Sequence, residues 1–176
     1  METITREITV RAARSRVWEV VTRAEHLGRW FGDAGAEIDL RPGGRLTLSF
    51  AGHGTTVGRV EQVDAPERFS FRWARTRDVE PAVGDETLVE FTLTETADGT
   101  VVQVRESGFA TLSGDAVAYH RGNVEGWAAK TAELQRYLEG EPADPTIDAE
   151  GEPAHPTIGA EGEPADPTTS TATVPS

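Results

Sequence analysis

Residues 113–139, SGDAVAYHRGNVEGWAAKTAELQRYLE, decide the fold class of this chain. Side chains suited to a buried face recur there every three or four residues, which is the spacing of one side of an α-helix: Val117, Val124, Trp127, Thr131, Leu134 and Leu138. Ser113 or Asp115 can cap the start of this helix, and Gly140 and Pro142 end it. A helix of about 26 residues is about 39 Å long, which is enough to cross a sheet of six or seven strands.

The residues before this helix predict such a sheet. Residues 3–11 alternate apolar and polar side chains, which is the period of a half-buried strand. Turn sequences such as Pro42-Gly43-Gly44 and Asp98-Gly99 separate six further predicted strands, which are 34–41, 44–51, 55–64, 67–76, 85–96 and 99–109. The clearest strands are apolar on one side only, so we expect an antiparallel sheet with a single covered face.

Two short helices are predicted between the first strand and the rest. One covers residues 14–22, with Ser15 near its start as a cap, and the other covers 24–31 and ends at Gly32. The chain is therefore expected to have an α+β fold, with a curved antiparallel sheet wrapped on the long C-terminal helix. A twisted sheet around one helix leaves space between the two layers, which is a natural place for a ligand cavity.

Composition divides the chain near residue 139. All 12 aromatic residues and all 17 Lys and Arg residues precede residue 140. Residues 140–176 hold seven of the ten prolines and repeat with a period of 11 residues, starting at Gly140, Gly151 and Gly162. So few apolar side chains cannot offset the entropy lost on ordering. We therefore predict one domain over 1–139 and a disordered, acidic, proline-rich tail over 140–176.

Charge and cysteine content exclude several classes of function. The chain has no cysteine, so it has no disulfide framework and no thiolate site. Its net charge of −13 argues against a nucleic-acid partner. It has no run of about 18 apolar residues that could span a membrane, and its start does not read as a secretory signal. We therefore expect a soluble, cytoplasmic protein.

The candidate binding residues are mostly aromatic and face the expected space between sheet and helix. An ordinary core explains such aromatic residues as well as a core that also lines a cavity. His120 lies one turn before Val124 on the long helix, where it is either a core histidine or a group that orients a ligand. The predicted lining set is Trp30, Phe31, Phe50, Phe71, Trp73, Phe91, Phe109, His120, Val124 and Trp127.

Other patterns indicate no metal or cofactor. The four histidines are scattered, without the paired spacing of metal ligands. Gly52, Gly54 and Gly58 lead into a strand rather than a helix, so they do not form a dinucleotide fingerprint. Arg68, Arg72, Arg75 and Arg77 are interpreted as a solvated cluster paired with acidic neighbours. The carboxylates of Asp85, Glu86, Glu90 and Glu106 show no convergence that would indicate acid–base catalysis.

Short motifs in order along residues 3–139 resemble the START-like, or SRPBCC, superfamily of helix-grip proteins. The similarity is greatest to the branch named after the activator of the heat-shock protein 90 ATPase, including its bacterial members. The motifs are Ala12-Ala13, Val17-Trp18, Trp30, Pro42-Gly43-Gly44, Gly58, Pro66-Glu67-Arg68, Phe71-Arg72-Trp73, Gly99-Thr100, Gly108-Phe109 and Gly126-Trp127.

This resemblance implies a hydrophobic cavity under the C-terminal helix. Members of the superfamily bind lipids, sterols, polyketides or plant hormones, and some are cyclases or hydrolases. The leading hypothesis is therefore a protein that binds a hydrophobic or aromatic small molecule, with His120, Arg105 or Tyr119 orienting it. One alternative is a chaperone-linked or regulatory interaction protein, which could also self-associate. A third hypothesis is a cyclase- or hydrolase-type enzyme that uses the same cavity.

Overall fold

The computed structural model describes residues 3–140, so the predicted tail beyond Gly140 lies outside the described residues. In chain order the elements are β1 (Ile4–Val10), α1 (Arg14–Thr22), α2 (Ala24–Trp30), β2 (Ala36–Ile38), β3 (Arg45–Phe50), β4 (Gly54–Asp64), β5 (Arg68–Ala74), β6 (Glu86–Thr96), β7 (Gly99–Ser107), the 3-10 turn η1 (Phe109–Thr111) and α3 (Ala116–Glu139).

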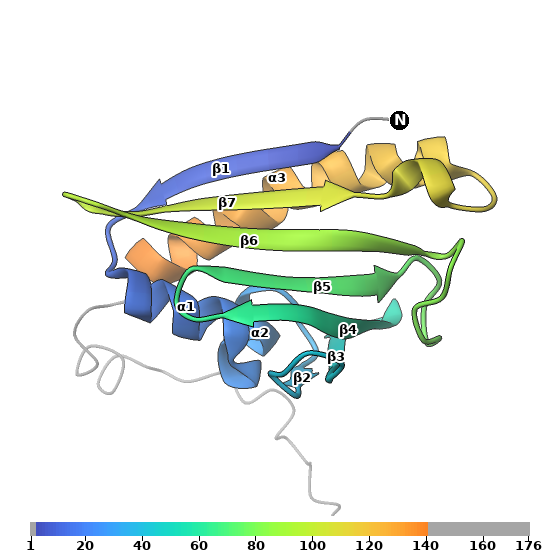
Figure 1. Cartoon of the computed structure of the whole chain (residues 1–176), viewed down its shortest axis with the longest axis horizontal. Coiled ribbons are helices and arrows are strands. Elements are labelled where there is room, and N and C mark those ends of the chain that lie inside the picture. Colours follow the sequence, from blue (N-terminus) through green and yellow to red (C-terminus); the bar gives the residue numbers. More distant parts are fainter. Residues whose placement is uncertain (1–2, 141–176) are drawn as a thin grey trace, which may run out of the picture. The chain divides into compact units, whose positions relative to one another are not determined.

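The strands form one antiparallel, seven-stranded sheet in the order β1-β7-β6-β5-β4-β3-β2. Each strand from β2 to β7 pairs with the next one along the chain, and β1 joins the sheet beside β7. In Figure 1 the sheet lies in front of the long α3, and α1 and α2 lie on the same side of the sheet as α3. This arrangement confirms the predicted α+β fold with a curled sheet on a C-terminal helix.

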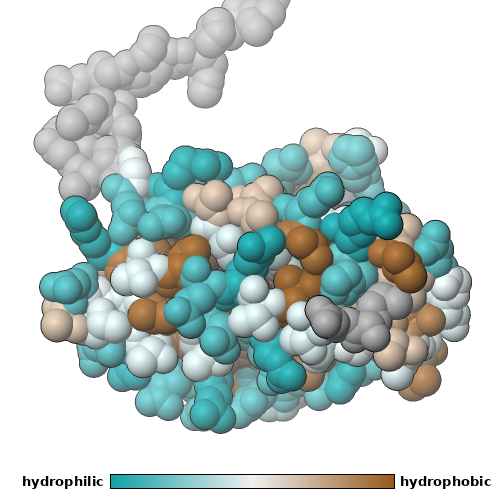
Figure 2. All heavy atoms as spheres, turned by 90° about the horizontal axis from the view of Figure 1, so that it is seen from above, coloured by the Kyte–Doolittle hydropathy of each residue, from teal (hydrophilic) through white to brown (hydrophobic). Residues whose placement is uncertain are grey.

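The apolar periods of the sequence explain which face each element buries. In β6 every second residue is buried, and Val89, Phe91 and Leu93 point to the core. In α3 the buried residues are Trp127, Thr131 and Leu134, which follow the helical spacing. Hydrophilic residues cover most of the face seen in Figure 2, and hydrophobic ones lie between them in small separate patches.

Three local expectations need correction. The cap of α1 is Ala13, which makes no side-chain hydrogen bond, so Ser15 does not cap this helix. Val117 is 57% exposed and lies off the buried face of α3, whereas Ala116 and Tyr119 of the same turn pack against the core. The strand predicted over 34–41 is only three residues long. By contrast, the predicted cap Asp115 accepts a hydrogen bond from the backbone N–H of Ala118 at 2.9 Å.

The core is dominated by aromatic rings that β5, β6, α2 and α3 bring together. Phe69 and Phe71 on β5 face Phe91 on β6, with ring centroids 6.2 and 6.4 Å from that of Phe91. The ring of Trp127 meets that of Phe91 from the helix side at 6.1 Å. The indole N–H of Trp30 donates to the carbonyl of Val20 at 2.9 Å, which links α2 to α1. The Trp30 ring also meets that of Phe91 at 6.4 Å, so these contacts attach both short helices and α3 to one face of the sheet.

Candidate binding cavity

A cavity of about 240 Å³ lies between the β3–β5 side of the sheet and α3. We call it the α3 cavity and define it by its lining residues, which are Phe31, Phe50, Trp73, Arg77, Gly122, Asn123, Gly126, Trp127 and Lys130. A smaller cavity of about 80 Å³ shares four of these residues and adds Thr56, Ala74, Arg75 and Tyr119. The two cavities are thus neighbouring parts of one region.

Aromatic rings form the apolar walls of the α3 cavity. The indoles of Trp73 and Trp127 stack, with centroids 5.7 Å apart and planes inclined by 27°. The ring of Phe31 meets both indoles edge-on, at 5.8 and 5.5 Å, and Phe50 lies 6.5 Å from Phe31. Such walls favour flat apolar molecules, which can stack on the rings or meet their edges.

The predicted lining residues separate into three groups in the structure. Four of them line the α3 cavity: Phe31, Phe50, Trp73 and Trp127. Phe71 and Phe91 are buried behind these walls, and Trp30 lines a different pocket. Phe109, His120 and Val124 line neither the α3 cavity nor its smaller neighbour among the described residues. The His120 ring instead packs edge-on against Phe109 at 4.7 Å.

Two glycines of α3 keep the helix side of the α3 cavity open. Gly122 and Gly126 are one helical turn apart and both line the cavity. A Cβ atom built on either glycine would meet no atom within 4 Å outside the helix's own backbone. A glycine inside a helix costs about 1 kcal/mol relative to alanine. Both glycines are exposed, so a side chain added at either one would enter open space beside the cavity without displacing packed atoms.

A buried carboxylate lies behind the tryptophan walls. Glu106 on β7 is 0% exposed. Its oxygens accept hydrogen bonds from the indole N–H groups of Trp73 (3.0 Å) and Trp127 (2.7 Å). The Thr87 hydroxyl donates at 2.6 Å, and the Asn123 amide donates at 2.9 and 3.0 Å. These four donor side chains replace the water that a carboxylate otherwise requires.

Glu106 therefore orients the walls of the α3 cavity rather than lining it. Among the described residues it has no ion-pair partner within 4.0 Å. Both tryptophans and Asn123 line the cavity and donate to the same carboxylate, so their ring and amide planes are set by one group. This buried acceptor thus connects β7 and β5 to α3.

The smaller cavity is lined by two uncharged polar side chains that the α3 cavity lacks, Thr56 and Tyr119. Thr56 is 4% exposed, and its hydroxyl oxygen has no hydrogen-bond partner. Burial, and then the charge of Glu106, raise the pKa of Tyr119 to about 12. The Tyr119 phenol therefore stays protonated at neutral pH and can donate a hydrogen bond.

Two cations lie at the Phe50 side of the α3 cavity. The guanidinium carbon of Arg77 lies 4.9 Å from the centre of the Phe50 ring, and Lys130 Nζ lies 5.8 Å from it. Arg72 and Arg75 pair with carboxylates as expected for the arginine cluster. The prediction does not hold for Arg68 and Arg77, because neither side chain has a hydrogen bond or ion pair within residues 3–140.

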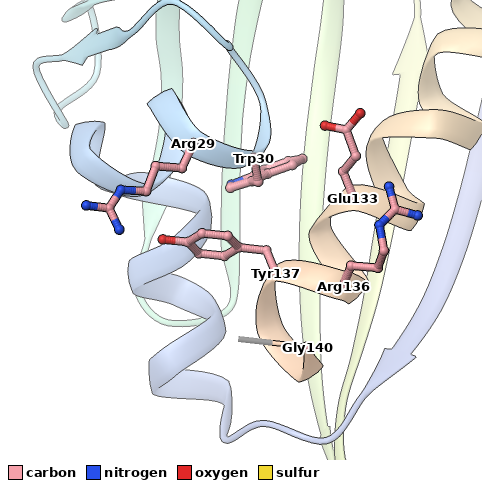
Figure 3. A pocket seen from close by; sticks show the side chains of 6 residues that line it. All are labelled: Arg29, Trp30, Glu133, Arg136, Tyr137 and Gly140. Carbon is pink, nitrogen blue, oxygen red and sulfur yellow. The ribbon is translucent and has the colours of Figure 1, made fainter. Parts of the chain in front are cut away.

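A separate pocket of about 310 Å³ lies between α2 and the end of α3. In Figure 3, Trp30 on α2 points toward Glu133 on α3, and Tyr137 reaches from α3 toward α2, while the side chain of Arg29 points away from α3. Arg136 and Gly140 at the end of α3 complete the lining. The Tyr137 hydroxyl is 2.7 Å from Nδ1 of His26, which ties α2 to α3. Its charged lining residues are two arginines and one glutamate, so the pocket favours neither an anionic nor a cationic ligand.

The remaining candidate residues lie away from the α3 cavity. Arg105 pairs with Glu90 at 3.2 Å on the outer face of the sheet. Asp85 pairs with Arg75, and Glu86 lies near Arg59 and Arg72, so these carboxylates do not converge. Within the described part of the chain no group of three or more His, Asp or Glu side chains could hold a metal ion. No helix there is long and apolar enough to cross a membrane.

Sequence reasoning gave little weight to Glu106 and did not single out Thr56, Gly122, Asn123 or Lys130. The sequence does contain a signal for Glu106, which is its position in the alternating pattern of β7. Thr100, Val102 and Val104 are buried at alternate positions, and Glu106 continues that inward series. An acidic residue at a strand position whose side chain points into the core predicts hydrogen-bond donors around its carboxylate. The chain positions of Arg77 and Lys130 carry no comparable signal, because their meeting at Phe50 depends on the fold.

The fold and the aromatic cavity define the chain as a helix-grip protein. The family model described as "Activator of Hsp90 ATPase homolog 1-like protein" matches residues 11–139, so the chain belongs to that family. A comparison with curated proteins finds no match.

Solved structures support the same fold. The chain is similar to protein MLL2253 from Mesorhizobium loti, with a TM-score of 0.66 and 22% identity over 78% of this chain and 96% of that one. It is similar to the Aha1 dimer from Colwellia psychrerythraea, with a TM-score of 0.63 and 18% identity over 79% and 97%. It is also similar to CalU16 from Micromonospora echinospora, with a TM-score of 0.58 and 24% identity over 84% and 82%.

Proposed function

We propose that this protein binds a small apolar or aromatic molecule in the α3 cavity. The observation that carries the proposal is a cavity lined by aromatic rings and by two glycines of α3. Gly122 and Gly126 leave space on the helix side, while Trp127 of the same helix and Trp73 and Phe50 of the sheet supply ring surfaces. Burial of an apolar ligand there contributes about 25 cal/mol per Å².

The size of the cavity limits the ligand. A protein cavity of about 150 Å³ can hold benzene. The α3 cavity of about 240 Å³ therefore fits a molecule of one or two rings, and its smaller neighbour of about 80 Å³ can accept a substituent. Sterols and long lipids are larger than this space.

Filling the cavity with a side chain provides the test. We expect Gly126→Leu to lower the affinity for 2-naphthamide, a neutral two-ring probe, at least about tenfold, because the leucine occupies the space of the rings. Ala129→Leu is the matched control, since Ala129 is an exposed residue of the same helix outside the cavity lining. Titration followed by NMR measures both affinities.

Two results would overturn the proposal. Equal binding of 2-naphthamide by the Gly126→Leu and Ala129→Leu variants would place the probe elsewhere. No binding to the unaltered protein, together with a native mass equal to that of the bare chain, would leave the α3 cavity without a small-molecule role. A reproducible excess mass that is lost on denaturation would instead identify a carried ligand.

The two other hypotheses stay predictions. A chaperone-linked role has only the family relationship in its favour, and the described domain carries no feature that selects a protein partner. A cyclase- or hydrolase-type activity needs a reactive group in contact with the ligand. Glu106 is enclosed by four donors behind the walls, and His120 packs against Phe109, so neither side chain lines the α3 cavity.

A further inference from the structure

The charges around the α3 cavity are arranged with opposite signs at its two sides. The carboxylate of Glu106 lies behind Trp73 and Trp127. The cationic groups of Arg77 and Lys130 lie over the ring of Phe50, which lines the same cavity. The negative group is completely buried, whereas Arg77 is exposed. The buried side is therefore negative and the Phe50 side is positive.

The two cations at the Phe50 side of the α3 cavity have hydrogen-bond donors that an anion can use. Arg77 comes from the segment after β5 and Lys130 comes from α3, and both approach one aromatic ring. Lys130 contacts the carboxylate of Glu133 at 3.1 Å. Arg77 has no carboxylate partner within the described range, whereas Arg75, two residues earlier in the chain, pairs with Asp85. A planar guanidinium with open donors suits a carboxylate, which it can bind with two parallel hydrogen bonds.

A second, independent observation points into the same region. The hydroxyl of Thr56 is buried and unpartnered, and it lines the smaller cavity together with Arg77, Tyr119 and Asn123. A buried polar atom without a partner destabilises a protein, because it has lost water and gained no other hydrogen bond. A ligand substituent with a hydrogen-bonding oxygen would satisfy this hydroxyl, and the protonated Tyr119 phenol could donate to the same substituent.

From this geometry we infer the chemical class of the ligand, an inference that rests on the proposed binding function. The α3 cavity takes an aromatic carboxylate of one or two rings, with its rings between Trp73, Phe50 and the Gly122–Gly126 strip of α3. Its carboxylate lies at Arg77 and Lys130. The reverse orientation would bring the anion toward Glu106, and repulsion between like charges disfavours it.

The test compares two probes of nearly equal shape. We expect 2-naphthoate to bind the unaltered protein about tenfold more tightly than 2-naphthamide, because only the acid forms charge-assisted hydrogen bonds with Arg77. In the Arg77→Gln variant this preference is expected to fall to about two or less. Arg105→Gln removes a cation from the outer face, where Arg105 pairs with Glu90, and it should retain the preference. NMR titration gives all of the dissociation constants.

The outcomes separate this inference from the proposed function. If the acid and the amide bind equally well, or if Arg77→Gln keeps the full preference for the acid, the assignment of an anionic ligand is wrong while binding in the cavity stands. If neither probe binds the unaltered protein, both the inference and the proposed function fail. Lys130→Gln, a second variant on a different element, should weaken the preference in the same direction.

Discussion

At the scale of single residues, Glu106 is a buried acceptor on which several side chains converge. Its carboxylate accepts from two indoles, one hydroxyl and one amide, and no cation within ion-pair distance balances it among the described residues. Removing a buried acceptor leaves its donors without partners, which costs more than the hydrogen bonds themselves contribute. The two tryptophans that wall the α3 cavity therefore depend on this one side chain.

We expect Glu106→Gln to lower the free energy of unfolding by about 2 kcal/mol or more, because the new amide N–H group faces N–H donors. Urea denaturation followed by tryptophan fluorescence measures the change. Glu90→Gln serves as control, since Glu90 pairs with Arg105 at the surface, where an ion pair contributes about 1 kcal/mol or less. Equal stability of the two variants would show that the donors find other partners.

At the scale of elements, α3 combines a stripe of buried residues with two glycines, which carry no side chain. Trp127, Thr131 and Leu134 attach the helix to the sheet. Gly122 and Gly126 lie beside this stripe and weaken the helix without relieving any clash. Gly58 on β4 is a contrasting case, because a Cβ there would come within 2.9 Å of the Arg72 carbonyl oxygen.

We expect Gly122→Ala to raise the free energy of unfolding by about 0.5 to 1 kcal/mol, since alanine favours the helix and its methyl group enters open space. Gly58→Ala should lower the same quantity, because its methyl group meets backbone. Thermal and urea unfolding report both changes. A loss of stability in Gly122→Ala would mean that the glycine serves the fold rather than the cavity.

At the scale of the whole molecule, the described core contains every aromatic side chain of the chain. The family model ends at residue 139, and α3 ends at Glu139. Residues 140–176 hold no aromatic and no basic residue, and they carry −8 of the net charge of −13. The division into a domain and an acidic repeat tail follows from this composition and stays a prediction.

We expect a chain that ends at Glu141 to unfold at the same urea concentration as the full chain, within about 0.5 kcal/mol. The apolar burial that stabilises the domain comes from residues before this point. The same truncated chain should bind 2-naphthamide with unchanged affinity. A clear loss of stability would show that the repeats contribute to folding, and a loss of binding alone would show that they contribute to the site.

Local sequence patterns predict most of this fold. The alternation in β6 and the three-to-four spacing in α3 arise from the backbone geometry of each element, so they are visible without knowing any partner. Turn residues give the boundaries of the strands to within a few positions. The predictions failed where the local signal is weak, as at the cap of α1 and at Val117 near the start of α3.

The sequence by itself thus determined the antiparallel sheet, the covering helix and the aromatic character of the space between them. The tertiary structure alone decided which rings line the α3 cavity, which carboxylate holds them, and where Arg77 and Lys130 meet. Trp73 and Trp127 reach Glu106 from positions 33 and 21 residues away. Such contacts depend on strand register and on the position of α3 across the sheet, which no local period encodes.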